Sequence, residues 1–317
     1  MESEKPVVIV NPKSGGGLSE RRWAALVAPL TDGLGAFDTR FTESVGDGRR
    51  LAHEEAAGGR QLVVAFGGDG TISEVADGIM SARRGNDTAT GRDGSSALGI
   101  IPRGTGGDFR RTLVLPNDVA KAARHLRTAP AHRVDMGRAT FVTDEGVTAT
   151  RHFINLASFG FSADAARRAN SSHKRFGAKL AFLGATMGSL MGYENVEVII
   201  TIDGGEPRRQ TTLLGAIGNG CFFGGGMKIC PTGCLDDGLL DVVVIGDVTR
   251  GYVMRKLSSI YAGNHLSLPP VSSVRARKIE VAPVPGSPPI PIELDGETPG
   301  FLPATFEVLP SVLSLRF

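Results

Sequence analysis

The sequence predicts a two-domain fold: an α/β domain built on a parallel sheet, followed by a mostly antiparallel β-sandwich. The length of 317 residues exceeds the usual size of one compact domain, so we expect two. Short apolar runs alternate with helix-like segments up to about residue 130, whereas strand-like runs bounded by Gly, Pro or Asp dominate the remainder. We place the domains at residues 1–130 and 131–317 and leave open a return of the C-terminal segment to the first domain.

In the first domain, apolar runs suited to buried strands alternate with amphipathic segments. This alternation predicts a parallel sheet with crossover helices, and the ligands of such sheets bind beyond the carboxyl ends of the strands. The expected strands are Pro6–Val10, Ala36–Phe41, Leu62–Phe66 and Leu98–Ile101, and the expected helices are Leu18–Leu30, Asp47–Ala57, Ile72–Arg83 and Asp118–Arg127.

In the second domain, strand patterns predominate and predict the sandwich. One helix is expected to interrupt them, because apolar residues recur at helical spacing from Arg175 to Leu190. The expected strands are Val134–Phe141, Arg151–Ala157, Val196–Ile202, Gln210–Gly218, Leu239–Ile245, Lys278–Val281, Ile290–Leu294 and Thr305–Leu309.

Composition narrows the class of protein. The net charge of +2 argues against a dedicated nucleic-acid binder, and the hydrophobic fraction of 41% suffices for a sizeable core. Three cysteines without a secretory leader indicate reduced thiols and a cytoplasmic protein. No run of about 18 apolar residues is present, so any work on a membrane would be done from the water side.

Three glycine-rich turns follow expected strands of the first domain: Asn11–Gly17, Gly67–Thr71 and Pro102–Asp108. Consecutive glycines let a backbone approach phosphate closely and aim its N–H groups into a concave nest. One such turn is weak evidence, because tight turns need glycine anyway, but three at corresponding strand ends indicate a phosphate site. The P-loop pattern and the dinucleotide-binding glycine pattern are both absent.

Five ordered motifs resemble those of the diacylglycerol kinase catalytic-domain family, which includes bacterial soluble lipid kinases and sphingosine kinases. The motifs run through nearly the whole chain and are Asn11–Gly16, Gly67–Val75, Pro102–Thr105, Asp236–Asp241 and Glu293–Glu297. The resemblance implies a first domain like that of phosphofructokinase and NAD kinase. It also implies transfer of the γ-phosphoryl group of ATP to a lipid hydroxyl, with Mg²⁺ as the metal cofactor.

The resemblance also assigns candidate binding residues. In the second domain it implies a metal site made by Asp237, the Leu239 carbonyl and Cys234, the last through its backbone oxygen because a thiol is a poor ligand for Mg²⁺. The expected nucleotide contacts are Asn11, Thr42, Gly67, Gly68, Asp69, Gly70, Thr71, Ile72, Ser73, Glu74, Gly104 and Thr105.

Three acids are candidates for the catalytic group that accepts the proton of the lipid hydroxyl. Asp295 and Glu297 lie on a glycine-containing turn after a strand, where a plain hairpin with solvated acids is the alternative. The family match favours Glu297 as the base with Asp295 beside it. Asp69 stays a rival, and a carboxylate among phosphates also suits Mg²⁺.

A basic segment, from Arg167 to Lys179, leads into the apolar stripe of the second domain and is a candidate surface for peripheral membrane contact. The expected partner is a lipid at a membrane surface, with no nucleic acid, and a homodimer stays open. Two other functions also stay open: an NAD kinase-like phosphotransferase, and a non-catalytic lipid-binding module of the same fold.

Overall fold

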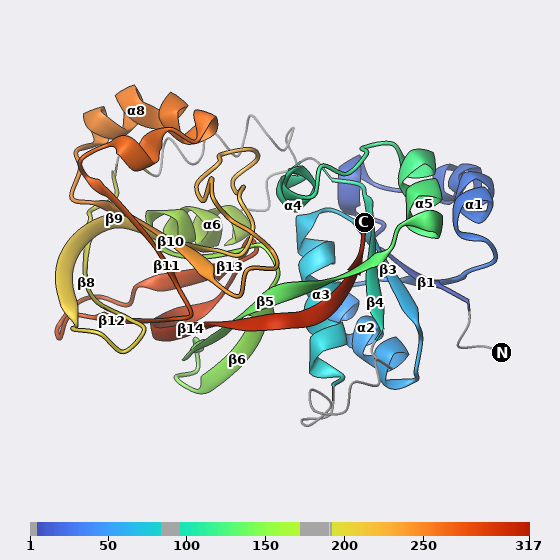
Figure 1. Cartoon of the computed structure of the whole chain (residues 1–317), viewed down its shortest axis with the longest axis horizontal. Coiled ribbons are helices and arrows are strands. Elements are labelled where there is room, and N and C mark those ends of the chain that lie inside the picture. The colour runs from blue at the N-terminus through green and yellow to red at the C-terminus, as the bar shows by residue number, and fades with distance from the viewer. Residues whose placement is uncertain (1–4, 84–95, 105, 172–189, 191) are drawn as a thin grey trace. The chain divides into compact units, whose positions relative to one another are not determined.

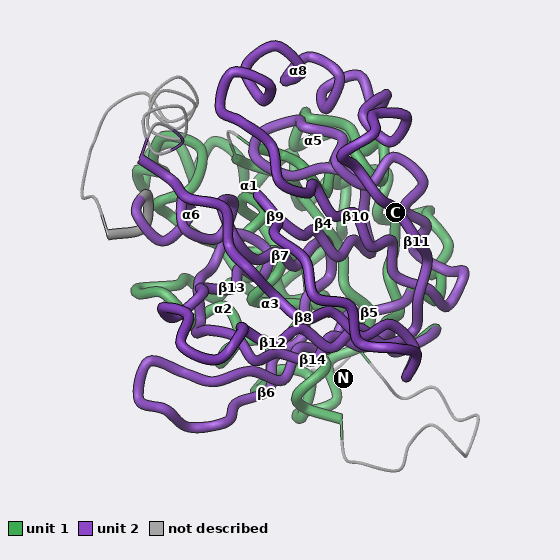
Figure 2. Tube along the Cα trace, turned by 90° about the vertical axis from the view of Figure 1, so that its left-hand side faces the viewer, with its two compact units in different colours: residues 1–134, 311–317 green, residues 135–310 purple. Residues whose placement is uncertain are grey.

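A computed structural model describes residues 5–83, 96–104, 106–171, 190 and 192–317. The chain divides into two compact units (Figure 2). Unit 1 comprises Met1–Val134 and Ser311–Phe317, and unit 2 comprises Asp135–Pro310. The chain passes into unit 2 within strand β5 (Ala131–Val142) and returns within strand β14 (Glu297–Arg316).

Unit 1 is built on a parallel sheet with the strand order β14-β4-β3-β1-β2. Only the last residues of β14, Ser314–Arg316, pair with β4. The other strands are β1 (Val7–Val10), β2 (Asp38–Phe41), β3 (Leu62–Gly67) and β4 (Ala97–Pro102). The parallel sheet predicted for the first domain is confirmed, and the carboxyl ends of β1, β3 and β4 lie at one edge.

Helices cover both faces of this sheet (Figure 1). On one face, α1 (Glu20–Leu34) and α5 (Val119–Thr128) pack on Val8, Val64 and Phe66. Helices α2 (Asp47–Ala57) and α3 (Asp69–Ser81) pack on each other. The side chains of Val8, Val64 and Phe66 are fully buried, and each such burial is worth about 1.5–3 kcal/mol, which makes the sheet a rigid platform.

The second glycine-rich turn differs from its prediction. Helix α3 begins at Asp69 rather than at Ile72, with Gly68 as its N-cap. The residues Asp69–Thr71 therefore form the first helical turn, where backbone N–H groups have no partner within the helix. Helix α4 (Asp108–Thr112) was not expected and begins at the end of the third glycine-rich turn.

Unit 2 is mostly antiparallel, as predicted. Its pairings run in a closed circuit, β9-β7-β13-β14-β12-β8 and back to β9, around a core that includes Phe159, Ile292 and Phe306. A closed circuit leaves few sheet edges unpaired. The strands not yet given are β6 (Thr148–Phe153), β7 (Leu156–Gly160), β8 (Val196–Ile202), β9 (Arg208–Gly218), β10 (Leu240–Gly246), β11 (Val271–Ala276), β12 (Lys278–Pro283) and β13 (Pro291–Leu294).

Two strand predictions were wrong in extent. The expected strand Arg151–Ala157 is two strands, β6 and β7, because the backbone N–H groups between them bind a side chain instead of a sheet partner. The expected strand Thr305–Leu309 is part of the much longer β14. Its prolines do not end it, because Pro303 and Pro310 fall between stretches that pair with different strands.

The prediction of a single helix in the second domain was also wrong. Helices α6 (Phe161–Ser171) and α8 (Arg250–Ala262) cover one face of the strands β7, β9 and β10. The helix expected from Arg175 lies outside the described residues except for Leu190. Among the described residues, none of the helices is long and apolar enough to span a bilayer.

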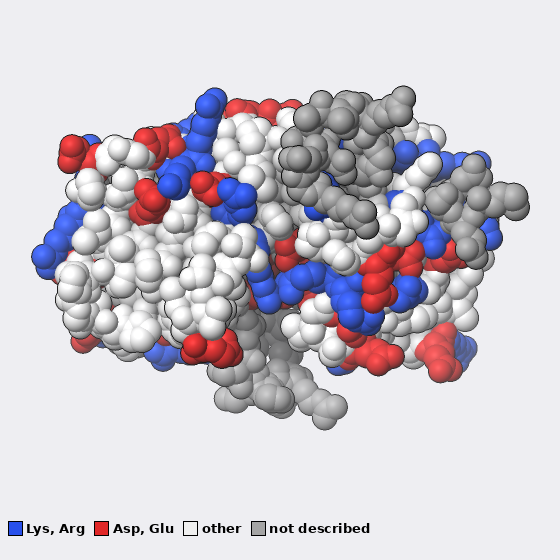
Figure 3. All heavy atoms as spheres, turned by 90° about the horizontal axis from the view of Figure 1, so that it is seen from below, with Lys and Arg blue, Asp and Glu red and all other residues white. Residues whose placement is uncertain are grey.

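Surface charge is mixed on the face drawn in Figure 3, where Lys and Arg side chains lie among Asp and Glu side chains. A nucleic-acid binder would gather its positive charge on one face or along one groove. The part of this face that the described residues form thus carries charges of both signs.

Candidate active site

The three glycine-rich turns of unit 1 lie together, because they leave neighbouring parallel strands at the same edge. The Arg103 N–H donates to the Gly67 carbonyl at 2.6 Å, which joins the third turn to the second. The Asn11 side chain donates to Thr71 Oγ1 at 3.0 Å, which joins the first turn to the second. The arrangement gathers backbone N–H groups as a phosphate site requires.

Gly104 is needed where the second and third turns touch, and Gly67 where the second turn folds onto its own Thr71. A Cβ on Gly104 would lie 2.7 Å from the Gly68 Cα, and a Cβ on Gly67 would lie 2.4 Å from Thr71 Oγ1. Real Cβ atoms do not approach other atoms so closely, so the backbone of the third turn can meet that of the second only with glycine at position 104.

Arg103 ties the first turn to the third and was not singled out from the sequence. Its guanidinium donates to the Ser14 carbonyl at 2.5 Å and to the Gly17 carbonyl at 2.9 Å. Burial, helped by the nearby Arg22, lowers the pKa of Arg103 from its ordinary value. An arginine stays charged under such conditions, so the turns enclose a fixed positive charge suited to an anion.

Glu74 positions the loop that carries Thr42 instead of facing outward. Its two carboxylate oxygens accept the N–H groups of Gly46 and Gly48, each at 2.8 Å. Thr42 is buried, and its N–H donates to the Val10 carbonyl at the end of β1. The backbone N–H groups of Glu43 and Ser44 donate to the Asp47 carboxylate and lower its pKa to about 2. These two hydrogen bonds hold the loop in addition to the bonds made by Glu74.

Asp69 holds the third turn in place. Its Oδ2 accepts the N–H of Asp108 at 3.1 Å and its Oδ1 accepts the N–H of Phe109 at 3.0 Å. A carboxylate at the start of a helix satisfies N–H groups that lack helical partners. The structure thus gives Asp69 a positioning role, while metal binding and proton transfer at this carboxylate stay predictions.

Not every expected nucleotide contact can be placed in the same way. Ile72 is buried in the core of unit 1, so only its backbone can face a ligand. Ser73 and Gly70 follow Asp69 within the first turn of α3. Thr105 lies outside the described residues.

Asp295 in unit 2 organises the corner between β6 and β7. Its carboxylate accepts the N–H groups of Ile154, Asn155 and Leu156 at 2.9, 3.0 and 2.8 Å. A carboxylate has about four lone-pair positions, so three of them are in use. Asp295 therefore has a positioning role, and its part in proton transfer stays a prediction.

A buried polar network connects the two late motifs of the sequence. The Asn219 side chain donates to the carbonyls of Asp135 and Ile154, at 3.0 and 2.8 Å. The Asp135 carboxylate in turn accepts the Gly238 N–H at 2.7 Å. Asp135 and Asn219 are fully buried, so the turn around Gly238 and the turn that carries Asp295 are held in one arrangement.

Glu297 differs from Asp295 because it is partly exposed and pairs with an arginine. Arg151 Nη1 lies 2.6 Å from its Oε2, and the side chains are 32% and 28% exposed. The neighbouring Glu293 is buried and accepts the Gly296 N–H at 2.7 Å, as well as the Ser158 hydroxyl. The turn that presents Glu297 is thus fixed from within unit 2.

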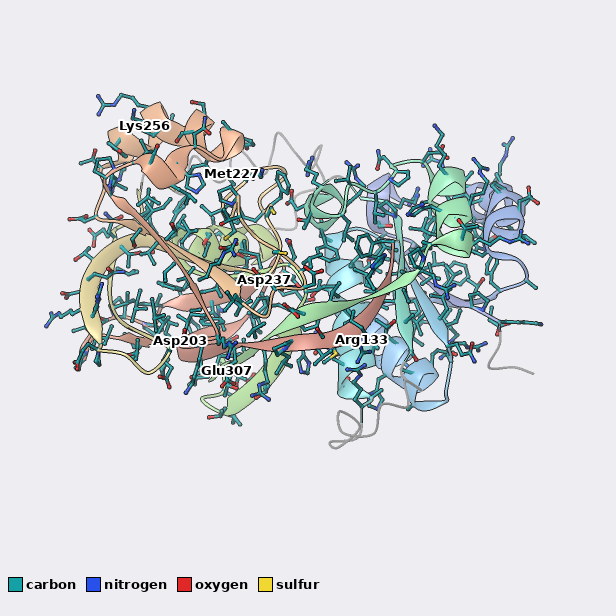
Figure 4. All side chains as sticks on the ribbon, in the orientation of Figure 1. Arg133, Asp203, Met227, Asp237, Lys256 and Glu307 are labelled. Atoms are coloured by element: carbon teal, nitrogen blue, oxygen red, sulfur yellow. The ribbon has the colours of Figure 1, made fainter. Side chains whose placement is uncertain are left out.

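An apolar cavity of about 190 Å³ lies beside this turn, within unit 2. Its walls come from α6, β9, β10, α8 and the loop after β9, and Figure 4 labels Met227 on that loop and Lys256 on α8. Glu293 and Gly296 also line it. An apolar cavity of about 150 Å³ stays dry and binds apolar ligands, so this one suits a hydrocarbon chain that reaches the Glu297 turn.

The chain matches two family models along most of its length. One, described as the diacylglycerol kinase catalytic domain, matches residues 5–139. The other, described as the YegS C-terminal NAD kinase beta sandwich-like domain, matches residues 155–317. The chain belongs to the diacylglycerol kinase and YegS-like family of lipid kinases. The resemblance seen in its sequence motifs is confirmed.

Individual relatives of this chain carry names from the same family of lipid kinases. A "Probable lipid kinase YegS-like" of Xanthomonas campestris pv. campestris is 32% identical over 82% of this chain and 80% of its own length. One from Chromohalobacter salexigens is 35% identical over 69% of this chain and 64% of its own length. A crystal structure described as that of "a putative diacylglycerol kinase" of Bacillus anthracis matches the whole chain and 96% of its own, with a TM-score of 0.75 and 26% identity.

The predicted fold class is confirmed by a more distant structure. Yeast NADH kinase matches 99% of this chain and 82% of its own, with a TM-score of 0.50 and 14% identity. So low an identity supports the shared fold alone, which is the NAD kinase-like arrangement expected for the first domain with a sandwich after it.

The predicted metal residues lie on the loop before β10, where the Asp237 carboxylate already has two partners, and their metal binding stays a prediction. Asp237 Oδ1 accepts the Leu239 N–H at 3.0 Å, and its Oδ2 lies 3.2 Å from Arg275 Nη1. The Cys234 thiol donates to Asp236 at 3.1 Å. Among the residues that the structure describes, no group of three or more His, Cys, Asp or Glu side chains could hold a metal.

Arg275 supplies positive charge where the family resemblance implies a metal ion. Besides Asp237 it contacts Asp241 at 3.4 Å and the Thr232 carbonyl at 3.2 Å. Burial raises the pKa of Asp241, while the Thr232 hydroxyl and Arg275 favour its charged form. The guanidinium therefore holds the loop before β10 against β11.

We expect Arg275→Ala to make the stability of nucleotide-free protein depend on divalent cations. Without the guanidinium, Asp237 and Asp241 repel each other until Mg²⁺ or Ca²⁺ neutralises them. The pair is partly exposed, so the loss is about 1 kcal/mol, or about 2–4 °C in Tm. Thermal melts with EDTA and with added Mg²⁺ measure this, with Arg209→Ala, an exposed pair on β9, as control. Clear stabilisation of the wild type by Mg²⁺ would contradict the assignment of Arg275 as the group that neutralises Asp237 and Asp241.

Proposed function

We propose that this chain transfers the γ-phosphoryl group of ATP to a hydroxyl of a diacylglycerol- or sphingosine-type lipid. One observation carries the proposal: the apolar cavity of unit 2 reaches the turn that presents Glu297. A hydrocarbon chain in that cavity would bring a polar head group to the part of its wall that Glu293 and Gly296 form, next to Glu297 in the sequence. The proposed setting is the cytoplasm, with lipid taken from a membrane surface.

The nucleotide half of the proposal depends on unit 1. Backbone N–H groups of the glycine-rich turns would bind the phosphates, and the Arg103 charge would offset theirs. ATP would enter as its Mg²⁺ complex, in which the ion neutralises charge on the β- and γ-phosphates. Positioning and charge neutralisation supply most of the rate in such reactions.

The acceptor half depends on Glu297. The lipid hydroxyl oxygen attacks the γ-phosphorus, the bond from that phosphorus to the β–γ bridging oxygen breaks, and ADP leaves. The hydroxyl proton passes to the Glu297 carboxylate, which Arg151 orients through their ion pair. Asp295 keeps the turn in position but does not touch the reacting atoms in this scheme.

A phosphorylation assay with a panel of acceptors tests the proposal. Purified full-length protein is incubated with labelled ATP, Mg²⁺ and vesicles that contain diacylglycerol, sphingosine or ceramide, and in parallel with NAD. Label in a lipid is the expected result. Label in NAD alone would instead establish an NAD kinase-like enzyme, and silence with every acceptor, despite ATP binding, would favour a non-catalytic lipid-binding module.

We expect Glu297→Gln to lower kcat about 10²–10⁴-fold while the affinity for ATP is unchanged, because only proton transfer is lost. The matched control is Glu307→Gln on the same strand, labelled in Figure 4, since Glu307 also pairs with an arginine, Arg138, at 2.8 Å. An unchanged kcat in the Glu297 variant would show that another group takes the proton.

A further inference from the structure

Helix α8 covers the apolar cavity but has no buried residue of its own. It begins after the N-cap Thr249, whose side chain accepts the Tyr252 N–H at 3.3 Å, and ends at Gly263. Figure 1 shows α8 as the orange helix at the outer edge of unit 2. A helix with so little burial is bound only weakly to the strands below it.

The outward face of α8 combines exposed apolar side chains with positive charge. Met254 is 55% exposed and Tyr261 is 40% exposed. Arg250 is exposed and lies at helical spacing from both, so these three residues share one face, and its Nη2 also donates to the Tyr193 carbonyl at 3.3 Å. The helix also carries Arg255 and Lys256 and contains no Asp or Glu.

The inward face is different, because Val253, Leu257 and Ile260 line the cavity. A lipid that enters from a bilayer must pass from the membrane into this cavity with its hydrocarbon chain shielded from water. A weakly held helix that already separates the cavity from solvent is the part of unit 2 best suited to meet the bilayer.

We propose that the outward face of α8 docks on an anionic lipid bilayer and that the acceptor lipid enters the cavity beneath it. Arg250 and Arg255 meet the anionic head groups, while Met254 and Tyr261 insert at the level of the head groups. Tyrosine suits that depth because its ring is apolar and its hydroxyl is polar. The route into the cavity rests on the proposed function, whereas docking can be measured without turnover.

The positive charge of α8 favours an anionic bilayer over another protein as the surface on which it docks. Each basic residue near an anionic membrane raises binding roughly fivefold, because the surface potential attracts it. The double variant Arg250→Gln/Arg255→Gln is therefore expected to bind about 25-fold more weakly to such a membrane. The variant Met254→Ser/Tyr261→Ser is expected to lose binding as well, because it removes the inserted apolar groups.

Co-sedimentation of the full-length protein with vesicles tests docking. The vesicles contain phosphatidylcholine alone or phosphatidylcholine with phosphatidylglycerol, and no nucleotide is present. Arg208→Gln/Arg209→Gln on β9 and Val147→Ser are matched controls, because these side chains are also exposed but lie away from α8. We expect wild type and controls to prefer the anionic vesicles, the arginine variant to lose that preference, and the Met254→Ser/Tyr261→Ser variant to bind both kinds of vesicle more weakly, all with unchanged melting temperatures.

A kinetic comparison tests entry through α8. With diacylglycerol in anionic vesicles, the arginine variant should lose activity in proportion to its binding, whereas a water-soluble short-chain diacylglycerol should be phosphorylated within about twofold of wild type. Equal binding of wild type and α8 variants to anionic vesicles would overturn the proposal, as would self-association through α8 without vesicle binding. If the wild type phosphorylates neither acceptor, the proposed function fails while the vesicle result still decides docking.

Discussion

Replacing Asp69 with alanine is expected to reduce kcat at least about 10³-fold while unit 1 stays folded. The variant loses the acceptor for the N–H groups of Asp108 and Phe109, so the third glycine-rich turn is no longer fixed against the second. A displacement of about 1 Å can cost about 10²-fold in rate. Loss of the phosphate nest should add to this, because phosphoryl transfer depends on fixed charge and position.

The stability of this variant should fall only moderately. The two N–H groups lie at the start of a short helix, where water can replace part of the lost bonding, so we expect about 2 kcal/mol and a drop of a few degrees in Tm. Asp118→Ala is the matched control, because Asp118 caps α5 in the same unit by accepting the Lys121 N–H at 2.8 Å. Turnover within tenfold of wild type in the Asp69 variant, or its complete unfolding, would contradict this account.

The positions of the glycine-rich turns could be predicted from the sequence because each turn is a local feature. Gly67 and Gly104 follow apolar runs directly, and parallel strands bring such turns to one edge whatever their distance along the chain. The role of Asp69 could not be predicted in the same way. Its partner Asp108 is 39 residues away, in a short helix that no periodicity indicates.

The same reason explains the error at the corner of β6 and β7. The apolar run Arg151–Ala157 looks continuous, and only the carboxylate of Asp295, 140 residues from Asn155, takes the N–H groups that would extend the strand. By contrast, α8 carried a local signal that was missed. Thr249 is a favourable N-cap, Gly263 a favourable end, and Val253, Leu257 and Ile260 recur at helical spacing.

The extent of β14 could not be predicted from local sequence rules either. Three prolines fall within β14, at positions 299, 303 and 310, and proline usually ends a strand. The strand continues because Pro303 and Pro310 lie where it changes partners, from β13 to β12 and then to β4, and Pro299 lies where the pairing with β13 shifts register, so each missing N–H costs little. Such changes of partner depend on the whole fold and leave no trace in a local pattern.

Asp295→Ala should cause the largest loss of stability in unit 2. Three N–H groups, those of Ile154, Asn155 and Leu156, would be left without their acceptor at a site that is 9% exposed. Each buried donor without a partner costs about 1–3 kcal/mol, so the total of about 3–9 kcal/mol is a large share of a typical stability of about 5–15 kcal/mol. We expect Tm to fall by about 10–20 °C.

Asp203→Ala separates the effect of burial from that of backbone strain. Both aspartates have a positive φ, 50° at Asp295 and 48° at Asp203, so alanine strains the backbone equally at the two sites. Asp203, labelled in Figure 4, also accepts two N–H groups, from Arg277 and Lys278, but it is exposed. Water can take over its role, so its melting temperature should fall much less.

In the Asp295 variant, activity and stability should fall together, whereas in Glu297→Gln only the activity should fall. The corner at Ile154 also accepts the Asn219 side chain, so its release loosens the network that reaches Asp135 and the turn around Gly238. The Glu297 turn then loses its fixed position, and both kcat and the affinity for the lipid acceptor should decline. Thermal melts and steady-state kinetics at a temperature where the variant is folded measure the two effects. An Asp295 variant as stable as Asp203→Ala, with only kcat reduced, would show that this carboxylate acts in the chemical step.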